Sequence, residues 1–151
     1  MLGRHSYQSY DTCRSNADTC AGPSPNYSSG WGRVNLTESI YTVMASCYAE
    51  GVPLEDDDSH EFSIEIKDEG ASLKATLVWT DRPGSMLQND LDLTIRAGGQ
   101  THVGNTGLNR TNNLEQIVWQ KIPQGTAKVR ISARSLTRGP QSYAVAWKVF
   151  L

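Results

Sequence analysis

The side chains most able to do chemistry in this sequence are carboxylates and amides concentrated between positions 81 and 115. They are Asp81, Asn89, Asp90, Asp92, Asn105, Asn112, Asn113 and Glu115. Calcium binds about six to eight oxygen ligands, which proteins supply as carboxylates, amide carbonyls, backbone carbonyls and water. The sequence therefore predicts a structural calcium site, whose ligands we expect among all of these residues except Asn112.

The spacing of Asp90 and Asp92 supports this prediction. On a β-strand, residues two apart project from the same face, so both carboxylates would lie opposite Leu91 and Leu93. Two carboxylates placed in this way repel each other unless a cation, or a set of N–H and amide donors, compensates them. The loop 82–89 can fold back and bring Asp81 or backbone carbonyls to the same place.

Hydrogen-bonded turns are the alternative explanation for these residues. Asp and Asn at strand ends often accept hydrogen bonds from nearby backbone groups and bind no metal. The sequence leaves both explanations open. The acidic run Glu55-Asp56-Asp57-Asp58 is a weaker candidate for a cation site, and a solvated linker explains it better.

The elements that would position these side chains are strands. From Glu61 onward apolar residues alternate with polar ones, which predicts strands at 62–66, 73–79, 91–95, 101–103, 115–120, 127–134 and 142–151. Turn signals rich in Gly and Pro separate them. Several short strands with no helix between them indicate an all-β fold, an antiparallel β-sandwich or barrel.

The first third of the chain has a different composition. Residues 1–32 are rich in Ser, Asn, Asp, Gly and Pro, which is typical of loops. A short helix is predicted at about 37–48, because Ile40, Val43, Met44 and Cys47 fall on one helical face. We therefore divide the chain into a loop-rich and helical part, 1–57, and a β-sandwich, 58–151.

Composition excludes several classes of protein. The 151 residues are 38% hydrophobic and 20% charged with a net charge of −2, which is ordinary for a globular domain. This balance gives no general attraction to nucleic acid or to an anionic membrane. No apolar run approaches the roughly 18 residues that a membrane-spanning helix needs. We therefore expect neither nucleic acid nor membrane as a partner.

Three cysteines make complete pairing impossible. Cys13 and Cys20 lie close together in a polar stretch, whereas Cys47 lies among apolar residues. A Cys13–Cys20 disulfide with Cys47 buried and free is the simplest interpretation, and three reduced thiols are the alternative.

Two sets of motifs resemble a known family. The first is Pro23 to Leu36, which contains Gly30-Trp31-Gly32-Arg33-Val34-Asn35-Leu36. The second consists of the ordered blocks Leu77 to Gly84, Asn89 to Leu93, Val103 to Asn105, Asn112 to Glu115, and Gly139 to Tyr143. Together they resemble the end of the catalytic domain and the C-terminal jelly-roll, or P-domain-like region, of subtilisin-like serine proteases.

The resemblance implies an organisation for the whole chain. Residues 1–57 would be the tail of a catalytic domain and a linker, with Trp31 and Arg33 packing between the domains. Residues 58–151 would be the jelly-roll. Related proteases are secreted and hold structural calcium in or beside this domain, so a secreted or extracellular location and a calcium cofactor are expected.

The catalytic motifs of that family are missing from this sequence. No Gly-Thr-Ser-Met nucleophile motif occurs, and His5, His60 and His102 have no serine of that type nearby. A Ser–His–Asp triad needs a base next to an activated serine, oriented by a carboxylate. We therefore predict that the chain is not an enzyme and that the active site lies upstream of Met1.

The predicted function follows from this absence. We expect a non-catalytic accessory domain that binds and stabilises the catalytic domain of its parent protease. The alternative is a module that binds extracellular carbohydrate or matrix protein, because jelly-rolls often serve that role. Only the analogy of fold supports the alternative.

Overall fold

The computed structural model describes residues 34–104 and 112–151. The chain divides into two units, Met1–Glu38 and Ser39–Leu151. Of the first unit only 34–38 are described, so the account below concerns the second unit and the helix that leads into it. No helix in the described ranges has the length and apolar character that a membrane crossing requires.

The predicted helix is present but shorter than expected. α1 runs Leu36–Met44, and the Asn35 side chain caps it by accepting the Glu38 N–H at 3.2 Å. Ser46, with a φ of 52°, follows the helix, and Tyr48–Glu50 then forms the strand β1. Helical periodicity predicted about four more residues. The pairing of β1 with the distant strand β8 overrides that local preference.

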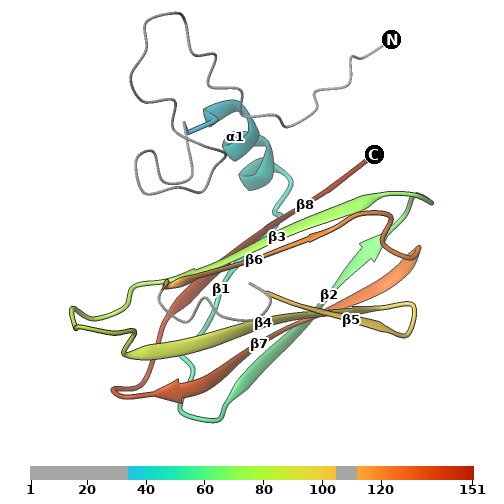
Figure 1. Ribbon diagram of the computed structural model, residues 1–151. Coiled ribbons are helices and arrows are strands. Elements are labelled where there is room, and N and C mark those ends of the chain that lie inside the picture. Colours follow the sequence, from blue (N-terminus) through green and yellow to red (C-terminus); the bar gives the residue numbers. More distant parts are fainter. Residues whose placement is uncertain (1–33, 105–111) are drawn as a thin grey trace, which may run out of the picture. The chain divides into compact units, whose positions relative to one another are not determined.

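Two four-stranded sheets form the body of the protein, as the ribbon shows in two layers (Figure 1). The first sheet has the order β1-β8-β3-β6, and the second has the order β2-β7-β4-β5. The remaining bounds are β2 Ser59–Ile66, β3 Ser72–Trp79, β4 Asn89–Ala97, β5 Gln100–Val103, β6 Leu114–Trp119, β7 Gly125–Leu136 and β8 Tyr143–Phe150. Strand pairing is antiparallel throughout the named strands.

This order confirms the predicted fold class. Strands distant in sequence, such as β1 and β8 or β2 and β7, become neighbours, which is the arrangement of an eight-stranded jelly-roll. All seven predicted strands occur. β1 is the addition, and its three residues are too few to show a period in the sequence.

Alternation of apolar and polar residues places the core between the sheets. Every second residue of β3 and β4 is buried, as are the corresponding residues of β7. The largest fully buried side chains are Leu54, Ile66, Leu73, Leu77, Leu91, Leu93, Ile95, Ile122, Val129, Ile131 and Val145. Each such Leu or Ile contributes about 1.5–3 kcal/mol through its removal from water.

Some residues that precede position 58 also belong to the sandwich. Leu54 is fully buried and exchanges two backbone hydrogen bonds with Gln141, at 3.0 and 2.9 Å. Gly51 lies under the ring of Tyr143, where any Cβ would collide with that ring. The segment that composition assigned to a linker therefore carries the strand and the core residue that close the first sheet.

Candidate functional site

Asp81 holds the loop between β3 and β4 in a closed conformation. Its two carboxylate oxygens accept the backbone N–H groups of Gln88 at 2.8 Å and Asn89 at 3.0 Å. The chain therefore turns back on itself across residues 82–88. The predicted return of this loop occurs, and the carboxylate of Asp81 serves as an acceptor for backbone donors.

Asn89 lies at the start of β4 and is 1% exposed. Its Nδ2 donates to the Arg138 carbonyl at 2.9 Å and to Gln141 Oε1 at 2.7 Å, while its Oδ1 accepts the Arg138 N–H at 3.2 Å. The backbone carbonyl of Asn89 in turn accepts the indole N–H of Trp79 at 2.8 Å. For Asn89 this geometry favours the hydrogen-bonded alternative.

Gln141 completes this buried polar network, and sequence analysis did not single it out. It is 6% exposed, and its Nε2 donates to the carbonyls of Thr80 and Ser142. Every buried side-chain N or O atom in the described part of the chain has a partner. The only signal in the sequence was the position of Gln141 inside the block Gly139 to Tyr143.

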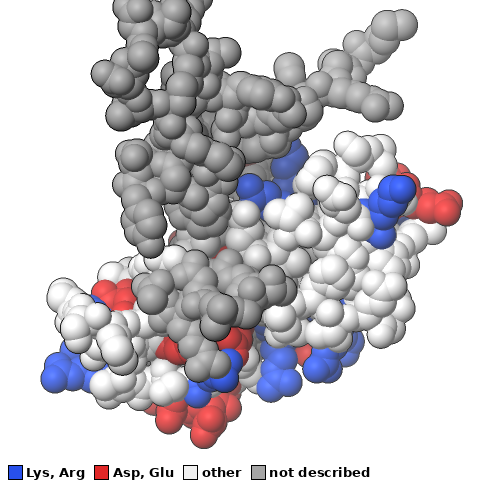
Figure 2. Space-filling model, viewed as in Figure 1, with Lys and Arg blue, Asp and Glu red and all other residues white. Residues whose placement is uncertain are grey.

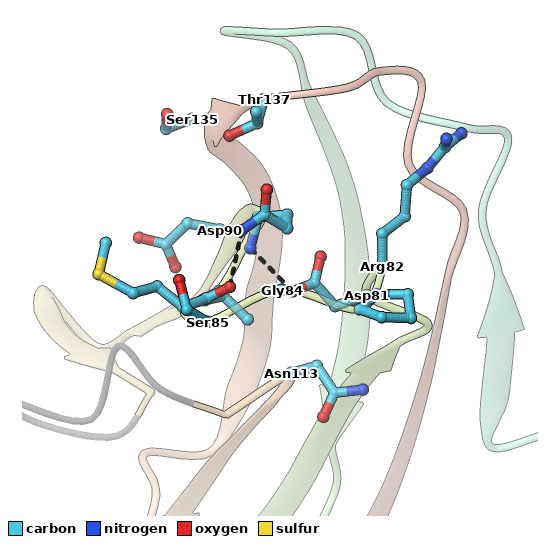
Figure 3. A pocket seen from close by; sticks show the side chains of 12 residues that line it. Asp81, Arg82, Gly84, Ser85, Asp90, Asn113, Ser135 and Thr137 are labelled. Carbon is cyan, nitrogen blue, oxygen red and sulfur yellow. Dashed lines mark hydrogen bonds between the residues drawn. The ribbon is translucent and has the colours of Figure 1, made fainter.

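An open cavity of about 740 Å³ lies beside this network (Figure 3). The loop 81–88 forms most of its wall, and Asp90, Asn113, Ser135 and Thr137 form the rest. Its lining is mixed in polarity. Figure 3 shows the Arg82 side chain extending away from Asp81, so the two do not form an ion pair there.

Asp90 and Asp92 project from the outer face of β4, as the sequence predicted. The burial of β4 alternates residue by residue, with Leu91 and Leu93 on the core side. The pairing of β4 with β7 shifts register between Asp90 and Leu91. An Arg134 guanidinium nitrogen lies 4.0 Å from Asp92 Oδ2, a long and partly exposed contact of small energetic value.

Glu115 connects the two sheets at an open edge. It lies on β6, and its Oε2 accepts the backbone N–H of Leu93 on β4 at 2.7 Å. β5 pairs with β4 only from Thr94 onward, so Leu93 lies just past the end of that pairing. The Leu93 carbonyl accepts the Gly104 N–H at 2.8 Å, and a Cβ at residue 104 would collide with the Glu115 side chain.

Burial raises the pKa of Glu115 from 4.5 to about 7, and the carboxylates of Asp92 and Asp90 add to the increase. The hydrogen bond from Leu93 opposes it. Negative charge is therefore concentrated at this edge, and a proton on Glu115 relieves part of it near neutral pH. A divalent cation would relieve the same repulsion.

The donor set here suits calcium in chemistry but is not gathered into a finished site. Asp90, Asp92 and Glu115 offer the hard oxygen ligands that calcium prefers. Within the described ranges, however, no three acidic, histidine or cysteine side chains enclose a common point. Asn113 contacts Trp79 through two bonds, its Nδ2 donating to the Trp79 carbonyl and its own carbonyl accepting the Trp79 N–H. The calcium site stays a prediction.

Several predicted residues lie outside the described residues. These are Cys13, Cys20, Trp31, Arg33 and Asn105. Cys47 is described, is half-buried and is not in a disulfide. The predicted Cys13–Cys20 pairing and the interdomain roles of Trp31 and Arg33 therefore stay predictions.

The described histidines have structural partners. His60 Nδ1 lies 2.9 Å from the Tyr143 hydroxyl, and the ring of His102 stacks on Trp119 with centroids 3.9 Å apart. Within the described ranges, neither ring is hydrogen-bonded to a serine.

Comparison with known proteins gives one informative similarity. A protein of Dictyostelium discoideum named serine protease/ABC transporter B family protein tagA is 29% identical over 149 aligned residues, which cover 79% of this chain. The chain spans only 8% of that protein's length. No family model matches the chain. The similarity links this region to a protease-named protein and leaves its role within that protein open.

The Asn89 network predicts a specific loss of stability. Asn89→Ala leaves the Arg138 backbone groups and Gln141 Oε1 without partners in a buried place, which we expect to cost about 2–4 kcal/mol. A thermal melt should show this as a decrease of roughly 4–16 °C for a chain of this size. Asn112→Ala, which truncates an exposed amide, is the control and should change the melting temperature much less. Equal decreases in both variants would contradict the structural role of Asn89.

The raised pKa of Glu115 predicts a pH dependence. Between about pH 4.5 and 7 the unfolded chain loses the Glu115 proton while the folded chain retains it, so the contribution of Glu115 to the free energy of unfolding decreases as pH rises. Above pH 7 the contribution is constant. Because the group is partly exposed, we expect a decrease of about 1–2 kcal/mol after solvent screening.

Urea unfolding in the presence of a chelator measures this effect. The free energy of unfolding of the wild type minus that of Glu115→Gln should decrease across this pH window, since the glutamine keeps an acceptor for the Leu93 N–H and does not titrate. Subtraction cancels the contributions of the other carboxylates. A difference that is constant from pH 4.5 to 8 would show that Glu115 titrates normally.

Proposed function

We propose that this chain is a non-catalytic accessory β-sandwich of a secreted subtilisin-like serine protease, and that it stabilises the catalytic domain to which it is joined. The observation that carries the proposal is the location of the resemblance blocks. The segments around Trp79, Asp81, Asn89, Asn113 and Gln141 are far apart in sequence but are hydrogen-bonded to one another at one end of the sandwich. Motif residues that build one buried network are what a shared fold requires.

The similarity to a protease-named protein is a second line of support. It covers most of the chain, and the matched region is a small part of a much longer polypeptide. A sandwich of this kind within a long protein is typical of an accessory domain. Whether the activity of that polypeptide resembles the name of the relative is part of the proposal.

The arrangement of the histidines supports a non-catalytic role. Activation of a serine needs an imidazole that is hydrogen-bonded to it and free to exchange a proton. His60 is held by Tyr143 between the sheets, and His102 lies flat against the indole of Trp119. In this proposal both rings contribute to packing.

The carbohydrate-binding alternative has less support in the described residues. Trp79 and Trp119 are each 4% exposed and belong to the core, and Trp147 packs on Phe62 with ring centroids 5.0 Å apart. A sugar platform requires aromatic faces that are open to solvent. Retention of the chain on insoluble polysaccharide or collagen at moderate salt would nevertheless favour the alternative.

Calcium is the proposed cofactor. Asp90, Asp92 and Glu115 would hold the ion at the open edge of β4, and the ion would neutralise charge that burial makes unfavourable. The hydrogen bonds of Asp81 and Asn89 make these two residues weaker candidates for ligands.

Deletion tests the stabilising role. The longer protease without residues 39–151 should lose activity on heating much faster than the intact protease, while its turnover on a small peptide substrate changes little. The reason is that a docked domain slows unfolding of the scaffold without contacting the reacting atoms. Thermal half-life and kcat measured on both forms decide the question. Equal half-lives would contradict the proposed function.

Chelation tests the cofactor. A ligand at 100 times its dissociation constant adds about 2.7 kcal/mol to stability. For this chain that corresponds to an increase of roughly 5–11 °C in melting temperature. We expect this shift on addition of calcium but not magnesium, and its loss in Asp90→Asn and Asp92→Asn. Glu69→Gln, which neutralises an exposed carboxylate in a turn, is the control. No shift in the wild type would leave the acidic edge without a metal role.

A further inference from the structure

The two outer faces of the sandwich differ in character. The outer face of β2-β7-β4-β5 is densely charged, with Glu61, Glu65, Asp90, Asp92, Arg96, Lys128, Arg130 and Arg134. Several of these side chains bind others on the same face, as Lys128 does with Glu61 at 3.2 Å. Charged side chains gather along the lower side of the molecule in Figure 2, where Figure 1 places this sheet. Such a face is satisfied by solvent and by its own pairs.

The outer face of β1-β8-β3-β6 is mainly uncharged. Its larger apolar side chains are substantially exposed: Tyr48 45%, Val78 39%, Val118 51% and Phe150 39%. Small or neutral residues, Ala144, Ala146, Thr76 and Gln116, lie in register between them. The charged residues on this face are Glu50, Lys74 and Lys148. A flat, contiguous surface of this composition is typical of an interface with another protein surface.

The two lysines suggest the charge of the surface that covers this face. Lys74 and Lys148 lie directly opposite each other on β3 and β8, and Val118 lies opposite Lys74 on the other side. Like charges in register repel each other. An acidic group on the covering surface would complement this pair, whereas a second basic surface would not.

α1 adds a second exposed apolar surface next in the chain. Leu36, Ile40, Val43 and Met44 fall along one side of the helix and are 69%, 56%, 59% and 76% exposed. No residue of α1 is buried. Only residues 45–47 separate the helix from β1, the edge strand of the uncharged face. Whatever precedes α1 is therefore tethered within a few residues of this sheet, and not of the charged one.

We propose that the outer face of β1-β8-β3-β6, together with the apolar side of α1, is the surface on which the sandwich docks to the preceding domain of its own polypeptide. This rests on the proposed function in taking that domain to be the catalytic domain of the protease. The tether gives the preceding domain a high effective concentration at this face, which neither a second copy nor a free ligand has.

Hydroxyl-radical footprinting tests the docking directly. Tyr48 and Phe150 should be labelled about threefold or more slowly in the longer polypeptide than in the 151-residue chain, because interface cores pack as densely as protein interiors. Met86, which is 76% exposed in the loop between β3 and β4, should be labelled equally in both. Equal labelling of Tyr48 and Phe150 in the two proteins would overturn the proposal.

A matched pair of substitutions tests the same face. Val118 and Val103 are both 51% exposed valines on edge strands, one on each outer face. Val118→Glu places a carboxylate opposite Lys74, which suits the sandwich by itself but would be buried against an acidic surface after docking. In the longer polypeptide Val118→Glu should restore the labelling of Tyr48, and Val103→Glu should not.

The same variants in the 151-residue chain separate docking from folding. Both should melt within about 2 °C of the wild type, as exposed substitutions usually do. If Tyr48 is protected in the 151-residue chain and the protection increases with concentration, the occupant is a second copy and the proposal is wrong. Because labelling does not depend on proteolysis, protection in a polypeptide that lacks protease activity would contradict the proposed function and leave the docking face supported.

Discussion

Burial of the inner faces of β3 and β8 against those of β4 and β7 is the interaction on which the rest of the structure depends. Leu73 and Leu77 face Leu91, Leu93 and their neighbours across the interior, and each is fully buried. These strands come from opposite ends of the domain, so the apolar layer forms only when the whole chain is in place. The fold is therefore set by long-range pairing, and the loops occupy the positions that this pairing leaves to them.

The candidate sites arise where the apolar layer ends and polar groups must still be satisfied. At the end of the sandwich the buried amides of Asn89 and Gln141 bind each other and the backbone of residues 138–142. At the side, the Glu115 carboxylate reaches Leu93 just past the end of β5. The first solution is complete within the described residues. The second leaves excess negative charge, so a proton or a cation becomes part of the stability of that edge.

Period-two alternation predicted the strands because a sandwich buries one face of each, and it also placed Asp90 and Asp92 on the outer side of β4. It missed β1, since three residues show no period and the strand depends on β8. Among the site residues, the sequence identified Asp81, Asn89 and Glu115 as important. It did not show that the first two bind backbone donors, because their partners come from a loop return and from a distant turn. Gln141 was missed for the same reason.

The two outer faces carry information that neither periodicity nor motifs contained. Alternation predicts which residues point outward but treats every outward position alike. Only the register of the strands shows that the acids and most of the basic residues fall on one sheet, while Val78, Val118, Tyr48 and Phe150 fall on the other. An outward face that solvent alone covered would be free to accumulate charge, as the β2-β7-β4-β5 face has. The uncharged face lies on the sheet that the chain enters from α1, and that position gives a physical reason for its composition.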